Sequence, residues 1–200
     1  GLGDVYKRQH IRFGEISIRQ IAESIQDDNS HDSEIFYKEL VWREFSYHLL
    51  FHFPHLTHDN LQKKFDSFEW ENKQKNIKSW QKGLTGYPIV DAGMRQLWQT
   101  GYMHNRVRMI VGSFLVKNLL THWRYGQEWF WDTLVDADIA SNSASWQWVA
   151  GTGADGIVYG NRAKKVLTQG WAPFYPQDYK VMQKIEIDLI CQKHPCYHLI

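Results

Sequence analysis

The residues from Asp136 to Trp148 place hydrogen-bond acceptors and indole rings within one short stretch. The stretch reads D-A-D-I-A-S-N-S-A-S-W-Q-W. Asp138 and Asn142 are four residues apart, so one helical turn puts both side chains on the same face. Trp146 and Trp148 follow at a spacing that directs their rings differently. Acceptors on one edge and stacked indoles on the other suit a flat aromatic ligand with a polar edge. The alternative is an acidic, capped helix end followed by core aromatics, because short motifs also arise by chance.

A second group of polar residues precedes this stretch. Gly101–Lys117 reads G-Y-M-H-N-R-V-R-M-I-V-G-S-F-L-V-K. Asn105 and Met109 are four apart and share a helix face, which Arg106 and Arg108 flank. Taken alone, Met109 is better explained as a core-filling side chain, because its flexible thioether fits irregular gaps.

Apolar spacing predicts the helices that position these groups, and no segment shows strand alternation. A short helix is predicted over Glu15–Gln26. A long one over Glu34–Phe53 is capped by Ser33 and ends before Pro54. The fold is therefore predicted to be all-α. The other predicted elements are an irregular segment at His55–Lys75, a helix with Pro88 in its first turn, the clearest helix at Asn105–Trp123, and a further helix over Gln127–Leu134.

The composition indicates one globular domain with an unusual number of aromatic residues. The chain has 200 residues, of which 43% are hydrophobic and 22% charged, and ten are tryptophan. A net charge of +1 does not indicate a strongly basic nucleic-acid protein, although a local basic patch is compatible with it. No apolar run of membrane length and no signal peptide are recognised. Two cysteines, Cys191 and Cys196, form no disulfide framework, so a reducing compartment is expected.

Histidine-rich segments raise the alternative of a metal site. His48 and His52 could share a helix face, but Pro54 breaks that helix and no zinc-enzyme pattern accompanies them. A group of cysteines and histidines lies near the end of the chain, but its spacing fits no standard zinc finger. No metal is therefore expected. The residues of that terminal group are Cys191, His194, Cys196 and His198.

Several longer motifs, taken in order, resemble a known family. They are W-R-E-F at Trp42–Phe45, T-G-Y-P-I-V-D-A-G-M-R-Q-L at Thr85–Leu97, the Gly101–Lys117 segment and W-Q-W at Trp146–Trp148. Together they resemble the helical FAD-binding domain of the DNA photolyase/cryptochrome family, and most of all the class I cyclobutane pyrimidine dimer photolyases. Phe36 and Tyr102 each replace a tryptophan that is common in the family and keep an aromatic ring.

The resemblance assigns roles to residues of this chain. It implies that Arg108 pairs with Asp136 and that Asn142 lies beside flavin N5, where plant cryptochromes typically carry Asp. A neutral amide adapts to a reduced or protonated N5. Glu39 and Arg43 would otherwise be an i, i+4 pair worth a few tenths of a kcal/mol. The residues implied to bind FAD are Phe36, Glu39, Arg43, Asn105, Arg108, Asp136, Asp138 and Asn142.

The resemblance also implies how damaged DNA is handled. Trp42 is expected to stack on a flipped base, which contributes roughly 1–3 kcal/mol in single-strand binders, and Glu39 to hydrogen-bond the lesion. Trp146, Trp123 and Trp70 occupy the positions of an electron-transfer chain, since indoles lose an electron more readily than aliphatic side chains. The residues implied to contact DNA or the lesion are Trp42, Arg43, Asn105, Arg106, Met109 and Trp148.

The two ends depart from the family. The likeness runs from about His10 to Asp155, which leaves 1–9 unmatched and 156–200 divergent. A Ser/Thr-rich turn that holds the flavin pyrophosphate in relatives is absent before Arg12–Ser17, so this chain is expected to bind FAD weakly. A reading-frame change could explain the tail. The family's N-terminal antenna domain is also missing, and a second chromophore is expected in that domain. The expectation is therefore a fragment of the family's FAD-binding domain.

The parent protein is expected to repair cyclobutane pyrimidine dimers by electron transfer from light-excited reduced FAD. The alternatives are a cryptochrome signalling flavoprotein, against which Trp42, Met109 and Asn142 argue, and a non-catalytic helical binding fragment. The expected partner is damaged DNA. The protein is expected to be a monomer and to have no membrane partner. The expected location is the cytoplasm of a prokaryote, or an organelle or nucleus in a eukaryote.

Overall fold

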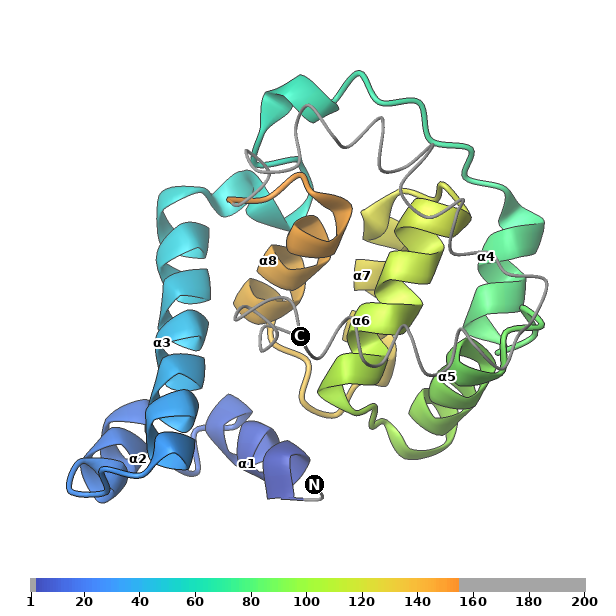
Figure 1. The fold of residues 1–200 in the computed structure, drawn as a ribbon. Coiled ribbons are helices and arrows are strands. Elements are labelled where there is room, and N and C mark those ends of the chain that lie inside the picture. The colour runs from blue at the N-terminus through green and yellow to red at the C-terminus, as the bar shows by residue number, and fades with distance from the viewer. Residues whose placement is uncertain (1–2, 155–200) are drawn as a thin grey trace.

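A computed structural model describes the backbone of residues 3–154 and the side chains of residues 8–154. Within this range every regular element is helical, which confirms the all-α prediction (Figure 1). Residues 156–200, predicted to be a divergent tail, and their cysteine–histidine group lie outside the described residues. The elements are α1 (Gly3–Arg12), α2 (Ile18–Ile25), α3 (His31–His52), the 3₁₀ turns η1 (Pro54–Thr57) and η2 (Lys63–Phe65), α4 (Gln74–Gln81), α5 (Pro88–Thr100), α6 (Asn105–Ser113), the π-helical turn η3 (Phe114–Asn118), α7 (Trp123–Thr133) and α8 (Ile139–Ala150).

The starts of the first helices follow from their capping residues. Ser17 and Gln20 form a reciprocal capping box at α2, so this helix begins three residues later than predicted. For α3 the predicted cap is wrong. Ser30, not Ser33, accepts the capping hydrogen bond, and it does so from the Ser33 amide at 3.2 Å. Asp28 holds this arrangement by accepting from the Ser30 amide at 2.9 Å and from the Ser33 hydroxyl at 2.5 Å.

The predicted long helix Asn105–Trp123 is broken into two. Helix α6 passes into the π-helical turn η3, and Leu120 adopts a φ of +46°, which ends the helical path. A new helix, α7, then begins at Trp123 under a cap provided by His122. The apolar periodicity continues across the break because residues on both sides of it face the same core, and this is why the pattern alone missed it.

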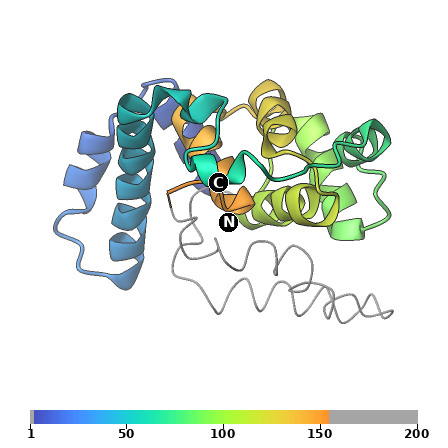
Figure 2. The ribbon, with the colours of Figure 1, turned by 90° about the horizontal axis from the view of Figure 1, so that it is seen from above.

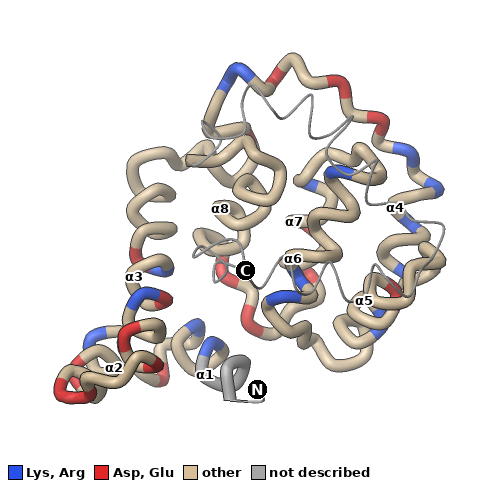
Figure 3. The backbone as a smooth tube through the Cα atoms, in the orientation of Figure 1, with Lys and Arg blue, Asp and Glu red and all other residues tan. Residues whose placement is uncertain are grey.

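Helix α8 lies at the centre of the fold, between α3 on one side and α6 and α7 on the other (Figures 1 and 2). Its Trp146 joins Trp80, Trp123 and Phe130 among the largest fully buried side chains. The Trp146 ring lies 5.0 Å from Phe130 and 6.2 Å from Trp80, with both pairs near perpendicular. Basic and acidic residues occur on both sides of α8, as the net charge of +1 suggests (Figure 3).

Two buried glutamines fasten the segment after α3 to the core. The Gln147 amide nitrogen donates to the carbonyls of Leu56 and Asp59, each at 2.8 Å, and its oxygen accepts from the Leu61 amide at 2.8 Å. Gln127 donates in the same way to the Thr57 carbonyl at 3.0 Å. The first part of the predicted irregular segment is therefore a fixed structure without a long helix.

Among the described helices, none is both long and apolar enough to cross a membrane.

Candidate functional site

A pocket opens between α1, α3 and the segment that leads into α8. It encloses about 890 Å³ of space, a figure that includes its open mouth. Apolar side chains such as Leu40 and Phe130 line part of it, and the rest is polar. This combination of an apolar wall with a few polar groups is typical of cofactor sites. The predicted residues that line it are Phe36, Glu39, Trp42, Arg43, Arg108, Asp136, Asp138 and Asn142.

One wall of the pocket contains a buried ion pair between α6 and the α7–α8 linker. Arg108 Nη2 lies 3.0 Å from both carboxylate oxygens of Asp136, and its Nε donates to the Met103 carbonyl at 2.8 Å. Burial lowers the pKa of Arg108, and attraction to Asp136 opposes this shift. The guanidinium stays charged at neutral pH, because the ordinary pKa of arginine lies far above it. The structure thus contains the pair that the family resemblance implies.

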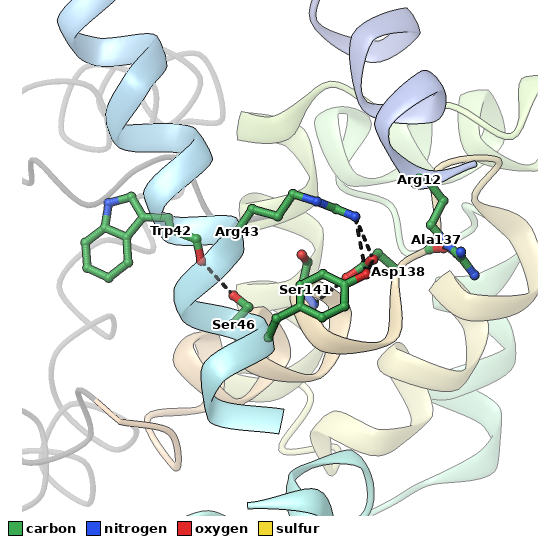
Figure 4. Close-up of polar contacts among 8 residues, drawn as sticks. Arg12, Trp42, Arg43, Ser46, Ala137, Asp138 and Ser141 are labelled. Carbon is green, nitrogen blue, oxygen red and sulfur yellow. Dashed lines mark hydrogen bonds and ion pairs between the residues drawn. The ribbon is translucent and has the colours of Figure 1, made fainter. Parts of the chain in front are cut away.

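Asp138 joins α3 to the start of α8 (Figure 4). One carboxylate oxygen accepts from the Ser141 amide at 2.9 Å and so caps α8. The other accepts from Arg43 Nη2 at 3.1 Å and from the Tyr47 hydroxyl. Burial raises the pKa of Asp138, but hydrogen bonds from Tyr47 and Ser141 and the charge of Arg43 outweigh it, so the net shift is downward. Asp138 is therefore a helix cap, the alternative kept open from the sequence, and a lining residue of the pocket.

Asn142 presents one defined atom to the pocket. Its amide nitrogen donates to the Gln127 carbonyl at 3.0 Å. Because a carbonyl can only accept, this bond fixes which end of the amide is the nitrogen. Asn142 lines the pocket, so its oxygen is the acceptor that this side chain can offer to a ligand.

Three features of this pocket were not predicted from the sequence. Tyr47 lies one helical turn after Arg43, a spacing that could have indicated it. Gln127 is fifteen positions from Asn142 and gave no local signal. Helix α1 covers part of the pocket with Arg8 and Ile11, and Arg8 lies in residues 1–9, which were predicted to be unmatched. The side chain of Arg12 anchors α1 by donating to the Ala137 carbonyl (Figure 4).

The predicted lesion-binding residues are not all at the pocket. Trp42 lines it, but in Figure 4 its ring leaves α3 in the direction opposite to Arg43. Asn105 is not among the lining residues. It is buried in the first turn of α6, and Met109 one turn later is also buried, as the core-filling alternative expects. The lesion roles of these residues, and of Arg106 and Trp148, remain predictions.

Trp146 sits in a slot between α6 and α7 that two glycines form. The nearest ring atoms lie 3.5 Å from an ideal Cβ position on Gly112. A Cβ on Gly126 would lie 2.1 Å from Trp146 Cη2, closer than any real contact. Gly126 therefore permits the indole to lie directly against the α7 backbone.

The other two predicted relay residues are joined by a histidine ring. The His122 ring centroid is 5.3 Å from the Trp123 ring and 5.3 Å from the Trp70 ring. Trp123 is fully buried and Trp70 is partly exposed, so the three rings run from the core toward solvent. The Trp123 indole N–H donates to Asn60 Oδ1 at 2.8 Å. The sequence analysis did not identify His122 or Asn60.

The predicted histidine pair does lie on one helix face. The ring centroids of His48 and His52 are 4.3 Å apart. Within the described range, however, no three or more His, Cys, Asp or Glu side chains gather as a metal site would require.

Comparisons with known proteins agree with this geometry. The family model described as the FAD binding domain of DNA photolyase matches residues 36–172. A deoxyribodipyrimidine photo-lyase of Agrobacterium fabrum is 59% identical over 73% of this chain and 31% of its own length. Cryptochrome-2 of Arabidopsis thaliana is 41% identical over 74% of this chain and 26% of its own length. The chain thus spans about a third of the length of the curated relatives it matches.

Solved structures give the same result. A class III photolyase from Agrobacterium tumefaciens has a TM-score of 0.69 and 57% identity, covering 74% of this chain and 32% of the other. An archaeal photolyase from Sulfolobus tokodaii, solved with two FAD molecules, also has a TM-score of 0.69, at 33% identity, covering 97% of this chain and 48% of the other. The family match, the helical fold and the pocket together show that this chain belongs to the DNA photolyase/cryptochrome family and carries sequence of its FAD-binding domain.

Proposed function

We propose that the protein to which this chain belongs uses light and reduced FAD to repair cyclobutane pyrimidine dimers in DNA. One observation carries the proposal. Seven of the eight residues predicted to bind FAD, all except Asn105, line a single pocket, and Trp42 lines it too. These residues come from α3, α6, the α7–α8 linker and α8, so only the fold brings them together. The relatives named deoxyribodipyrimidine photo-lyase support the choice of substrate.

The pocket residues fit a flavin chemically. Bound reduced FAD would supply the electron for bond splitting, while the protein supplies position and electrostatics. Asn142 offers a neutral oxygen acceptor in a fixed orientation. Asp136 and Asp138 are each paired with an arginine, so the site gains acceptor atoms without a large net negative charge. Arg43 is 19% exposed in its side chain and remains accessible to a phosphate.

For the DNA, the proposed contacts begin with two residues of α3 that line the pocket. Trp42 would stack on a base turned out of the duplex, and Glu39 would hydrogen-bond it from the same helix. Stacking of roughly 1–3 kcal/mol offsets much of the unpairing cost, which is smallest at a damaged site. Asn105, Arg106, Met109 and Trp148 complete the proposed lesion contacts.

Three tryptophans are proposed to carry electrons between the pocket and the surface. Trp146 and Trp123 are both buried and Trp70 is partly exposed, so Trp70 is suited to be the outer end of the path. This path would be needed only to reduce an oxidised flavin. Repair by a flavin that is already reduced would not use it.

The photolyase subclass remains a prediction. The motifs resemble class I enzymes most, whereas a solved structure at 57% identity is a class III photolyase. We further propose an antenna chromophore bound outside this chain, a monomeric protein and a location with the cellular DNA.

A blue-light signalling role is the second candidate. It is favoured by the 41% identity to a plant cryptochrome. The amide at Asn142 favours repair instead, since the resemblance places Asp there in plant cryptochromes. A non-catalytic binding fragment is the third candidate, and the unmatched residues 1–9 favour it.

The decisive experiment measures dimer repair by the full-length protein. Irradiated thymine oligonucleotide is incubated with protein and chemically reduced flavin under blue light, and intact thymine is quantified. Recovery of thymine from cyclobutane dimers is expected, and Trp42→Ala is expected to weaken binding of damaged DNA. Repair of (6-4) products alone would contradict the substrate assignment, and no repair of either lesion would favour signalling.

A further inference from the structure

The outer end of the tryptophan path contains a third aromatic ring. His122 contacts Trp70 edge-on, at an interplanar angle of 70°, and Trp123 at 31°. The His122 ring is therefore in contact with both indoles. Electron exchange between redox groups weakens steeply with the gap between them, so a ring that contacts both indoles connects them better than solvent does.

The environment of His122 fixes the state of its ring. Its Nδ1 accepts from the Arg124 amide at 3.2 Å and caps α7, so the neutral ring carries its hydrogen on Nε2. Burial lowers the pKa of His122, and the charge of Arg124 on α7 lowers it further. Asp66, in the segment after η2, acts in the opposite direction. The net shift is downward, so the imidazole is neutral at physiological pH.

The backbone holds Trp70 against this ring. The Glu71 amide donates to the Leu120 carbonyl at 2.9 Å, and the His122 amide donates to Asn72 Oδ1 at 2.9 Å. Asn72 and Leu120 both have a φ of +46°; asparagine tolerates this conformation, whereas leucine adopts it only where the surroundings impose it. Two distant segments are thus clamped together at the point where Trp70 meets His122.

We propose that His122 is a positioning residue of the outer tryptophan path, whose neutral ring links Trp123 to Trp70 and whose protonation interrupts electron transfer. The inference rests on the proposed light-driven function. In the linked step one electron passes from Trp70 to the oxidised Trp123, which returns to its neutral state while Trp70 becomes a radical cation. Photo-excited oxidised flavin is the initial one-electron oxidant. His122 neither gains nor loses an electron.

The distances set the effect of protonation. A positive charge on His122 would lie equally far, 5.3 Å, from the centres of both indoles. It would therefore raise the oxidation potential of both by a similar amount. Trp146 would be affected less, so the oxidised state would shift from the two outer tryptophans back to Trp146. The Coulomb energy at this distance in a protein environment should lower the population of oxidised Trp70 and Trp123 at least ~10-fold.

The test uses the full-length protein with oxidised FAD and no DNA. A laser flash starts the reaction, and transient absorption follows the long-lived tryptophan radical that a Trp70→Phe variant should lack. His122→Asn keeps a capping acceptor for α7 but removes the ring, and His122→Phe keeps a ring that cannot be protonated. His104 caps α6 in the same way, accepting from the Arg106 amide at 3.3 Å, so His104→Asn is the matched control.

The expected results distinguish a linking ring from a structural one. His122→Asn should lower the radical yield several-fold at neutral pH, because the ring that contacts both indoles is lost. The wild type should lose yield as the pH falls through a midpoint below the ordinary 6.5, while His122→Phe and His122→Asn should show no such dependence. His104→Asn should behave as the wild type.

A second readout does not involve flavin. NMR titration of histidine-labelled protein should give His122 a midpoint below the ordinary 6.5, and this should coincide with the midpoint of the radical yield. An unchanged yield and pH profile in His122→Asn would overturn the inference. If Trp70→Phe kept the long-lived radical, the path itself would be wrong. If the radical yields behave as expected but pre-reduced flavin repairs no dimers, only the repair assignment is refuted.

Discussion

Replacing Gly126 with alanine should displace the Trp146 ring. The new Cβ would lie 2.1 Å from Cη2, 2.4 Å from Cζ3 and 2.5 Å from Cζ2 of the indole. These atoms belong to a rigid ring that is 2% exposed and packed against Trp80 and Phe130, so the ring cannot turn aside locally. Either α7 or α8 must move, and Trp146 would then lose its present packing against Trp80 and Phe130.

The net cost follows from two opposing effects. Overpacking of a core typically costs 1–3 kcal/mol, and the depth of this overlap suggests about 3 kcal/mol. Alanine in a helix interior recovers about 1 kcal/mol relative to glycine. Gly126→Ala should therefore lower the free energy of unfolding by about 2 kcal/mol.

Gly112→Ala is the matched control. Its Cβ would meet the same indole ring at 3.5 Å, an ordinary van der Waals distance, so this variant should keep or slightly raise stability. Urea unfolding of the full-length protein, followed by helical circular dichroism, measures both, and flavin photoreduction reports the position of Trp146. Equal stability losses in the two variants, or none in Gly126→Ala, would refute the packing argument.

Three further predictions concern the pocket and the path. Arg108→Leu should cost about 3–5 kcal/mol, because it leaves the buried Asp136 carboxylate unpaired, and adding Asp136→Asn should recover part of this in urea unfolding. Since the folded pKa of Asp138 is lowered, its stabilising effect is present above the ordinary 3.8 and is lost as the pH falls through the lowered value. Asp138→Asn should therefore have a lower free energy of unfolding than the wild type at neutral pH, and should lose less of it as the pH is lowered. Equal losses on acidification in the two proteins would contradict this. Trp146→Phe should block photoreduction of oxidised flavin more than repair by reduced flavin, and equal losses would mean that Trp146 is only structural.

The sequence predicted those features that depend on local spacing. Asp138 and Asn142 share one turn of α8 and line the same pocket, as their separation of four residues suggested. The helical fold class followed from apolar periodicity in the same way. The family resemblance, not spacing, indicated the Arg108–Asp136 pair, because residues 28 positions apart carry no local signal of contact.

The features that were missed depend on tertiary structure. The helix predicted over Asn105–Trp123 is interrupted because the backbone at Leu120 takes a left-handed conformation, which leucine itself does not favour. The histidine cap at His122 gave no warning, since Ser, Thr, Asp and Asn are the usual capping residues. The contribution of α1 to the pocket was not predicted, because the motifs that carry the family resemblance begin only near the end of this helix.

The fastening of the segment after α3 by Gln127 and Gln147 has a consequence for local unfolding. The carbonyls of Leu56, Thr57 and Asp59 and the amide of Leu61 are all bonded to these two buried side chains, so these groups cannot open one at a time. The segment should open as one cooperative unit, with similar hydrogen-exchange protection along its length. Asn60 belongs to this unit and accepts from the Trp123 indole N–H, so each opening event would also bring water to that indole. The exchange rate of the Trp123 indole proton should therefore report the opening of a loop whose own sequence contains no tryptophan.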